Sequence, residues 1–298
     1  MPPLVSILIP VYNREKIIEQ TIQSALNQHY DNVDIILVDN CSTDSTYEIL
    51  KSYQSRYPNI RIARNDSNLG PVKNWVACLN LAQGKYIKFL WSDDQIFPDY
   101  LSHCVEAFEK NPKIGFVYTQ TILEEKLTRK AIYRFGPSGE YPSIDFIKSH
   151  ILGTKSVPVS PGCALFRKID VEKNLLVDLP NEHGLIFSQY GAGNDLLLFL
   201  LTAHQYSHFY YIDLPLSLFT SHADSLTVKH RLERFYYYSK LWFLKQYHYH
   251  TLYQTLALRL KLSSYHALVN EKISLWSILS TLPNFFLLIK NRMLKRFN

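Results

Sequence analysis

Runs of apolar residues alternate with helical patterns through the first part of the chain. Short apolar runs at 5–9, 34–38 and 60–63 predict three strands. Between them, apolar side chains recur at helical spacing over 15–28 and about 42–56, which predicts two helices. Such alternation is typical of a mostly parallel sheet with helices on both faces.

The same pattern continues to residue 119. It predicts a helix over 72–82, a strand over 86–90, a helix whose first turn contains Pro98, and a strand over 115–119. In open sheets of this kind, ligands bind outside the carboxyl ends of the strands. Polar clusters follow four of the expected strand ends, at 10–13, 39–40, 65–70 and 93–94. We therefore expect four loops to form one site.

Two adjacent carboxylates, Asp93 and Asp94, end the apolar strand that contains Phe89 and Leu90. Hard divalent cations prefer oxygen ligands, and such ions often hold the phosphates of a nucleotide. For an isolated Asp-Asp pair, a solvated surface turn is the alternative. The position at a strand end favours a nucleotide diphosphate site.

Composition indicates a globular protein of the reducing cytoplasm. With 298 residues and 47% hydrophobic content, the chain can bury a sizeable core. Its four cysteines match neither a disulfide framework nor a zinc site in spacing. No signal-like segment precedes the first expected strand, and no run of about 18 apolar residues predicts a membrane-spanning helix.

The net charge of +6 is unevenly distributed. Residues 229–298 contain twelve Lys and Arg against two Glu, a net +10, which leaves −4 for the remainder. Basic residues beside aromatic and aliphatic ones suit helices that lie on an anionic membrane. Packing of these helices on the rest of the protein, or a homodimer interface, is the alternative. No recognisable RNA- or DNA-binding module accompanies the charge, so nucleic acid is not an expected partner.

Four short motifs occur in order after the expected strands: Pro10-Val11-Tyr12-Asn13, Val38 to Asp44, Asn68-Leu69-Gly70 and Ser92-Asp93-Asp94. Together they resemble the signature of family 2 glycosyltransferases. The resemblance implies an α/β fold of the GT-A type, which binds nucleotide-sugars. It also implies a catalytic domain at 1–228, with a donor half (1–120) and an acceptor half (121–228), followed by a helical extension at 229–298.

The resemblance assigns the donor nucleotide to the first four loops. Asp39 would accept a hydrogen bond from the N–H of a uracil ring, which favours a UDP-sugar; a helix-dipole partner is the alternative. The other nucleotide-binding residues implied are Pro10, Val11, Tyr12, Asn13, Asn68, Gly70 and Asp93.

A metal ion, Mg²⁺ or Mn²⁺, is the implied cofactor. Asp93, Asp94 and His222 are its expected ligands. Many relatives have an additional acid where this chain has Trp91, so the sequence leaves open which of the two aspartates is the main ligand.

The acceptor side is expected in the second half of the chain. Gly162 and Cys163 lie in a small-residue turn that resembles the family's acceptor platform, although an ordinary hairpin corner would look the same. Asp195 resembles the family's general base, with Asn194 in place of the usual Glu. A helix cap is the competing role for Asp195.

We therefore expect an inverting, metal-dependent glycosyltransferase that transfers a sugar to a hydroxyl of a glycan or lipid-linked glycan. The implied setting is bacterial surface polysaccharide synthesis, at the cytoplasmic face of the membrane. A non-catalytic sugar-nucleotide or glycan-binding protein is the alternative, and a sugar nucleotidyltransferase is less favoured. A Gly-rich turn after the first strand, expected in a nucleotidyltransferase or a dinucleotide-dependent dehydrogenase, is absent.

Overall fold

The structure is a computed structural model that describes residues 1–126, 128–181, 184–221, 232–254 and 256. The chain divides into two compact units, Met1–Tyr253 and Gln254–Asn298. The fold given below is that of the first unit. His222 and most of the expected extension at 229–298 lie outside the described residues.

The first part of the chain alternates strands and helices, as the hydrophobic pattern predicts. The elements are β1 (Val5–Val11), α1 (Ile18–Leu26), β2 (Val33–Asp39), α2 (Thr46–Gln54), β3 (Ile60–Arg64), α3 (Pro71–Leu81) and β4 (Tyr86–Phe89). At most of their ends, these helices and strands differ from the expected ranges by a few residues.

The second part has longer strands, short antiparallel strands and additional helices. The elements are β5 (Gln95–Ile96), α4 (Tyr100–Lys110), β6 (Ile114–Glu125), β7 (Thr128–Ile132), β8 (Gly139–Pro142), α5 (Ser143–Leu152), η1 (Pro161–Cys163), β9 (Ala164–Arg167), α6 (Lys168–Asn174), η2 (Phe187–Gln189), α7 (Asn194–Gln205), β10 (His208–Ser221) and α9 (Glu233–Gln246). Pro98 precedes α4 instead of lying in its first turn, and Asp99 is the N-cap.

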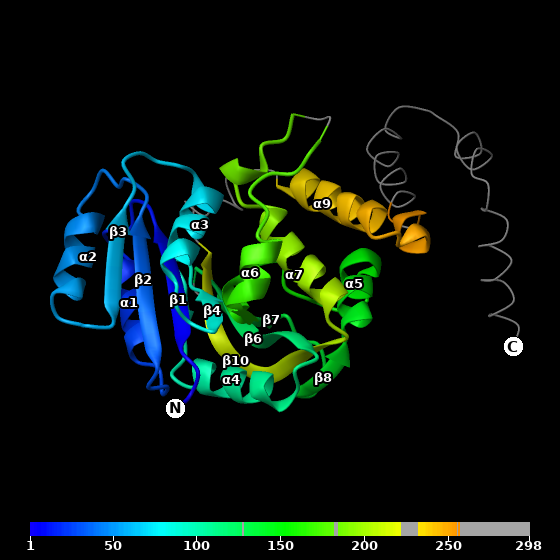
Figure 1. Ribbon diagram of the computed structural model, residues 1–298, viewed down its shortest axis with the longest axis horizontal. Coiled ribbons are helices and arrows are strands. Elements are labelled where there is room, and N and C mark those ends of the chain that lie inside the picture. Colours follow the sequence, from blue (N-terminus) through cyan, green and yellow to red (C-terminus); the bar gives the residue numbers. More distant parts are fainter. Residues whose placement is uncertain (127, 182–183, 222–231, 255, 257–298) are drawn as a thin grey trace, which may run out of the picture. The chain divides into compact units, whose positions relative to one another are not determined.

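One sheet joins these strands in the order β3-β2-β1-β4-β9-β6-β10-β5, with β7 added to β6 and β8 to β10 (Figure 1). Strands β3, β2, β1 and β4 run parallel. Beyond them, β9 is antiparallel to both β4 and β6, while β10 is parallel to β6. The expected parallel arrangement thus describes the first half, and the sheet as a whole is mixed.

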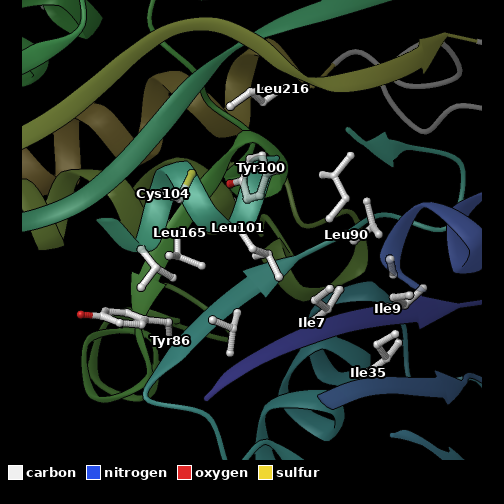
Figure 2. Close-up of a cluster of buried hydrophobic side chains, with 14 of the residues drawn as sticks. Ile7, Ile9, Ile35, Tyr86, Leu90, Tyr100, Leu101, Cys104, Leu165 and Leu216 are labelled. Atoms are coloured by element: carbon white, nitrogen blue, oxygen red, sulfur yellow. The ribbon is translucent and has the colours of Figure 1, made fainter. Parts of the chain in front are cut away.

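A hydrophobic core fills the face of the sheet that carries α1, α2 and α4. Ile7 and Ile9 of β1 and Ile35 of β2 lie there with Tyr100 and Leu101 of α4 (Figure 2). All five side chains are fully buried, and each of the four aliphatic ones contributes roughly 1.5–3 kcal/mol by the removal of apolar surface from water. Helix α3 also contacts β1 and β2, but its side chains are not part of this core. This packing holds the carboxyl ends of the parallel strands together at one edge.

Candidate active site

The loops after β1, β2 and β4 are joined by polar contacts at that edge. Asn13 donates its backbone N–H to Ser42 Oγ at 2.9 Å, and its Oδ1 accepts the N–H of Thr43 at 2.9 Å. The next residue, Arg14, lies 3.8 Å from Asp93, measured between Nη2 and Oδ2. Asn13 has φ 51°, a conformation that Asn tolerates better than most residues. The expected convergence of these loops is observed.

A network of asparagine side chains fixes the loop after β3. Asn40 donates to Asn68 Oδ1 at 2.9 Å and accepts from Asn65 Nδ2 at 2.9 Å and from the backbone N–H of Leu69 at 3.0 Å. Asn65 also donates to Asn74 Oδ1 of α3 at 2.9 Å. The sequence-predicted Asn68 therefore shapes the loop through its side chain.

Gly70 is the N-cap of α3, at the end of this loop. Its N–H donates to Asn68 Oδ1 at 3.0 Å, and its φ of 81° is one that residues with a Cβ rarely adopt. Pro71 follows at the first helical position, where its lack of an N–H costs nothing. Gly70 therefore contributes to the site through its backbone turn, which leads the loop into α3.

Asp39 is completely buried beneath Arg64. Both carboxylate oxygens accept the N–H of Ser42, at 3.1 and 3.3 Å, and Arg64 Nε lies 3.1 Å from Oδ2. The guanidinium of Arg64 is 4.7 Å from the ring centroid of Tyr47. Sequence analysis identified Asp39 but missed Arg64, which is the exposed partner of this pair with 40% of its side chain accessible.

The residues at the end of β1 divide into core and surface. Tyr12 is 40% exposed, while Pro10 is partly buried. Val11 is 1% exposed and belongs to the hydrophobic core. The expectation that Val11 lines the nucleotide does not apply to its side chain, because alternation along β1 turns it into the core.

Asp93 and Asp94 have different surroundings. Asp93 retains 18% side-chain exposure beside Arg14. Asp94 is buried, and its Oδ1 accepts the N–H of Thr220, at the end of β10, at 3.0 Å. Its backbone carbonyl accepts the hydroxyl of Thr21 at 2.9 Å. Burial, followed by the charge of Asp93, raises the pKa of Asp94 well above its usual range.

The carboxylate oxygens of Asp93 and Asp94 are the kind of ligand that a hard divalent cation prefers. Adjacent carboxylates repel each other when both are ionised, and a cation between them relieves that repulsion. Within the described ranges, no group of three or more His, Cys, Asp or Glu is arranged to hold a metal. The third expected ligand, His222, is not among those residues.

Trp91 connects the β4 loop to the turn before β9. Its ring centroid lies 4.9 Å from that of Trp75 and 5.7 Å from that of Phe89. Its indole N–H donates to Ser160 Oγ at 2.8 Å. A Cβ on Gly162 would lie 2.9 Å from the same indole nitrogen, so only glycine fits at this position beside Trp91.

A buried lysine supports the same turn from β4. Lys88 is fully buried and donates from Nζ to the carbonyl oxygen of Gly162. Its ammonium lies 4.1 Å from the ring centroid of Tyr100, and burial lowers the pKa of Lys88 to about 8. Cys163 is also fully buried, with Sγ directed to the carbonyl of Ser160 at 3.6 Å. Its thiol cannot meet an acceptor, which corrects the expected acceptor-binding role of that side chain.

Asp195 lies buried in the first turn of α7. Its Oδ1 accepts the N–H groups of Gly193 and Leu196 at 2.8 and 2.7 Å, and its Oδ2 accepts the hydroxyl of Tyr236 at 2.9 Å. Burial raises the pKa of Asp195 to about 7. The backbone contacts agree with a role at the helix start, and a pKa near neutrality suits a general base. The two roles are compatible in one side chain.

Tyr133 has an unusual backbone conformation and carries no sequence signal. It follows β7 with φ 63°, which is unusual for a bulky side chain, and its ring lies 6.3 Å from that of Phe219. Burial raises the pKa of Tyr133, with further contributions from Cys163, Asp195 and Asp94. The phenol therefore lies within electrostatic reach of both acidic centres. Backbone strain of this kind clusters at functional sites.

Comparison with known proteins identifies the family. The model of glycosyl transferase family 2 matches residues 6–175, more than half of the chain. The chain therefore belongs to glycosyl transferase family 2, and its fold is the GT-A fold expected from the motifs.

Several curated proteins are similar in sequence. TuaG of Bacillus subtilis (strain 168), assigned to teichuronic acid biosynthesis as a glycosyltransferase, is 38% identical over 180 residues, which are 60% of this chain and 67% of TuaG. Chondroitin synthase of Escherichia coli is 37% identical over 39% of the chain, and the chain spans 17% of its length. An uncharacterized glycosyltransferase of Haemophilus influenzae is 42% identical over 33% of the chain, which spans 40% of that protein.

Solved structures agree on the fold. A crystal structure of S. aureus TarS 1–349 in complex with UDP-GlcNAc matches with a TM-score of 0.70 at 17% identity. The match covers 95% of this chain and 80% of that one. A complex of the same protein with UDP matches with a TM-score of 0.65.

Two surface properties complete the description. Among the helices that the structure describes, none is both long and apolar enough to cross a membrane. A surface hollow of about 490 Å³ lies between α1 and β5, lined by polar side chains such as Gln20 and Gln23 and by apolar ones such as Phe97. It lies outside the loops described above, and none of the expected site residues lines it.

Proposed function

We propose that this protein is an inverting glycosyltransferase that moves a sugar from a UDP-sugar to a hydroxyl of a glycan or lipid-linked glycan. The observation that carries the proposal is the environment of Asp195. A buried carboxylate with a pKa of about 7, at the start of α7 in a family 2 chain, has the chemistry of a general base.

The donor would bind at the edge formed by the parallel strands. Tyr12 offers an exposed ring for the base, and the pair of Asp39 and Arg64 offers an acceptor and donors for its polar edge. The TarS structures contain UDP-GlcNAc and UDP, which supports a UDP-sugar for this chain as well. Asn13 and Gly70 would shape the loops around the ribose and phosphates.

Asp93 and Asp94, with His222, would hold Mg²⁺ or Mn²⁺. When bound, the ion supplies charge neutralisation on the departing nucleotide diphosphate. We assign Asp93 as the main ligand because it is the more exposed carboxylate. Asp94 would support it from beneath, since its Oδ1 already accepts the N–H of Thr220.

Asp195 would take the proton of the acceptor hydroxyl. As that proton moves to the carboxylate, the hydroxyl oxygen bonds to the anomeric carbon, and the bond from this carbon to the diphosphate oxygen breaks. Attack on the face opposite the leaving group inverts the anomeric configuration. Gly162 would contribute a close-packed surface to the acceptor side.

The biological setting we propose is bacterial surface polysaccharide synthesis at the cytoplasmic face of the membrane, such as lipopolysaccharide or capsule assembly. TuaG supports this setting, as does WfaP of Escherichia coli, a β-1,3-glucosyltransferase that is 32% identical over 46% of the chain. We place the end of the catalytic domain later than the expected boundary between residues 228 and 229. The first compact unit extends to Tyr253, so α9 belongs to the catalytic domain. Membrane contact or dimerisation would then involve residues beyond α9.

The experiment is a nucleotide titration followed by a transfer assay. UDP, GDP and dTDP are titrated with and without Mn²⁺ by calorimetry, and UDP-sugars are then tested for UDP release with the unchanged protein and Asp195→Asn. We expect Mn²⁺-dependent preference for UDP, and UDP release that Asp195→Asn abolishes while binding remains. Binding that is equal in both proteins, without UDP release from either, would favour a non-catalytic binding protein. Retention of anomeric configuration in the product would exclude the proposed mechanism.

A further inference from the structure

Helix α9 lies beside α7 (Figure 1). Asp195 belongs to the first turn of α7. Tyr236 of α9 donates its hydroxyl to Asp195 Oδ2 at 2.9 Å. One residue before it, Phe235 packs edge-on against Phe187, with 5.3 Å between ring centroids. Phe235 is 2% exposed, so the helix is held in place by an apolar anchor next to the polar contact.

Gly193 links α9 and the carboxylate of Asp195. Its N–H donates to Asp195 Oδ1 at 2.8 Å. A Cβ at Gly193 would lie 2.3 Å from Ser239 Oγ of α9, so the close approach of this helix requires glycine. The same residue thus orients one oxygen of Asp195 and admits the helix whose tyrosine binds the other.

We propose that Tyr236 is a positioning residue for the general base, so that α9 completes the catalytic site. The proposal rests on the role of Asp195 in the proposed function. It gives part of the extension expected at 229–298 a task in catalysis, where composition alone suggests membrane or interface helices.

The hydrogen-bond geometry explains how this would work. A carboxylate can accept about four hydrogen bonds, two on each oxygen. In the described residues, Oδ1 of Asp195 accepts two N–H groups, and Oδ2 accepts one hydroxyl. Oδ2 therefore keeps one acceptor position, and the tyrosine fixes its direction. This is the position at which the proton of an acceptor hydroxyl could arrive.

The same hydroxyl would set the proton affinity of the base. A hydrogen bond donated to a carboxylate favours the ionised form and lowers its pKa, which opposes the effect of burial. The described groups that face Asp195 are Tyr236 of α9, Tyr133 after β7, and the N–H groups of α7 and its N-cap. Only Tyr236 combines a direct contact with a removable side-chain donor.

Tyr236 could instead serve only to anchor α9. Other side chains of the helix do so: the hydroxyl of Tyr238 donates to the carbonyl of Pro180 at 3.1 Å, and Lys240 donates to that of His150 at 3.0 Å. Tyr238→Phe is therefore a matched control for Tyr236→Phe. Each variant removes one hydroxyl from the same helix and keeps the ring.

The test measures the proton equilibrium of Asp195 directly. Protein labelled with ¹³C at aspartate carboxyl groups is titrated by NMR, and the Asp195 signal is identified by its absence in Asp195→Asn. We expect this signal to titrate about one pH unit higher in Tyr236→Phe, and to be unchanged in Tyr238→Phe. An unchanged titration in Tyr236→Phe would overturn the proposal, as would an equal shift in both variants.

UDP release from UDP-sugars supplies the second readout. If the pKa of the base rises from about 7 by about one unit, Tyr236→Phe loses about fivefold in kcat at pH 7 and recovers near pH 9, with KM for the donor unchanged. A kcat loss that is the same at every pH would indicate a structural role only. Full activity of Asp195→Asn would instead overturn the proposed base, whatever the Tyr236→Phe titration shows.

Discussion

The indole N–H of Trp91 donates to Ser160 Oγ at 2.8 Å, and this contact joins the loop after β4 to the turn before β9. The first loop carries the carboxylates of the donor site. The second belongs to the acceptor half of the expected domain. At Trp91 this chain therefore has a side chain that joins the two halves of the site.

This packing predicts that Gly162→Ala destabilises the protein. The added methyl would lie 2.9 Å from the indole nitrogen of Trp91 and 3.1 Å from the ring of Phe219. Overpacking of this kind costs about 1–3 kcal/mol of unfolding free energy. Urea denaturation measures the change. Gly139→Ala is the control, because nothing lies within 4 Å of a Cβ there, and equal stability of both variants would contradict the packing argument.

The unequal burial of Asp93 and Asp94 predicts unequal effects on metal-dependent binding. Asp93→Asn is expected to weaken the Mn²⁺-dependent part of UDP binding about 10- to 100-fold, because it removes the more exposed charge. Asp94→Asn keeps an oxygen for the N–H of Thr220 and is expected to have the smaller effect. Calorimetric titration of UDP at several Mn²⁺ concentrations distinguishes them. The reverse order of effects would make Asp94 the main ligand.

Asp39→Asn is expected to weaken UDP binding about tenfold or more. The amide places a donor where a uracil N–H needs an acceptor, and a buried polar mismatch is costly. Asp34→Asn is the matched control, because Asp34 pairs with Arg61 on the same two neighbouring strands, near their amino ends. If both variants bind UDP equally well, Asp39 does not contact the base.

Local pattern was enough to predict the parallel half of the fold and the meeting of its loops. Hydrophobic periodicity and turn residues mark β1 to β4, and parallel pairing places Asn13, Asp39 and Asp93 at one edge. The short strands β7 and β8 were missed. β7 is mostly exposed and therefore lacks an apolar pattern, and β8 is stabilised by pairing with β10, which is distant in the sequence.

The properties of the site residues depend on contacts that are remote in sequence. Asp94 differs from Asp93 because it binds Thr220, 126 residues away. Asp195 is bonded to Tyr236, 41 residues away, within an aromatic run whose composition alone suggests a membrane face. No local sequence pattern encodes such pairs. The sequence could therefore identify Asp93, Asp94 and Asp195 as candidates, but it could not show how their burial and hydrogen bonding differ.

Asp195→Asn is expected to abolish transfer and, at pH 8, to stabilise the fold. In the folded protein the pKa of Asp195 is raised to about 7, whereas an unfolded Asp titrates near 3.9. A carboxyl whose pKa is raised by folding contributes stability that is complete below about pH 4 and lost as the pH rises through 7. The amide oxygen can still accept both N–H groups, and the amide NH₂ can donate to the hydroxyl oxygen of Tyr236, so the variant keeps these contacts without a buried charge. The unchanged protein should therefore lose about 2–4 kcal/mol more than the variant between pH 4 and pH 8.

Urea denaturation at pH 4.5, 6 and 8 measures this difference. Asp31→Asn, at an exposed position, is the control and should follow the unchanged protein at every pH. A variant that is less stable than the unchanged protein at pH 8 would mean that the ionised Asp195 holds α7 and α9 in place, and would favour the helix-cap role. A variant that is more stable and inactive would instead show that the fold tolerates an unfavourable buried charge, which a general base requires and a structural cap does not.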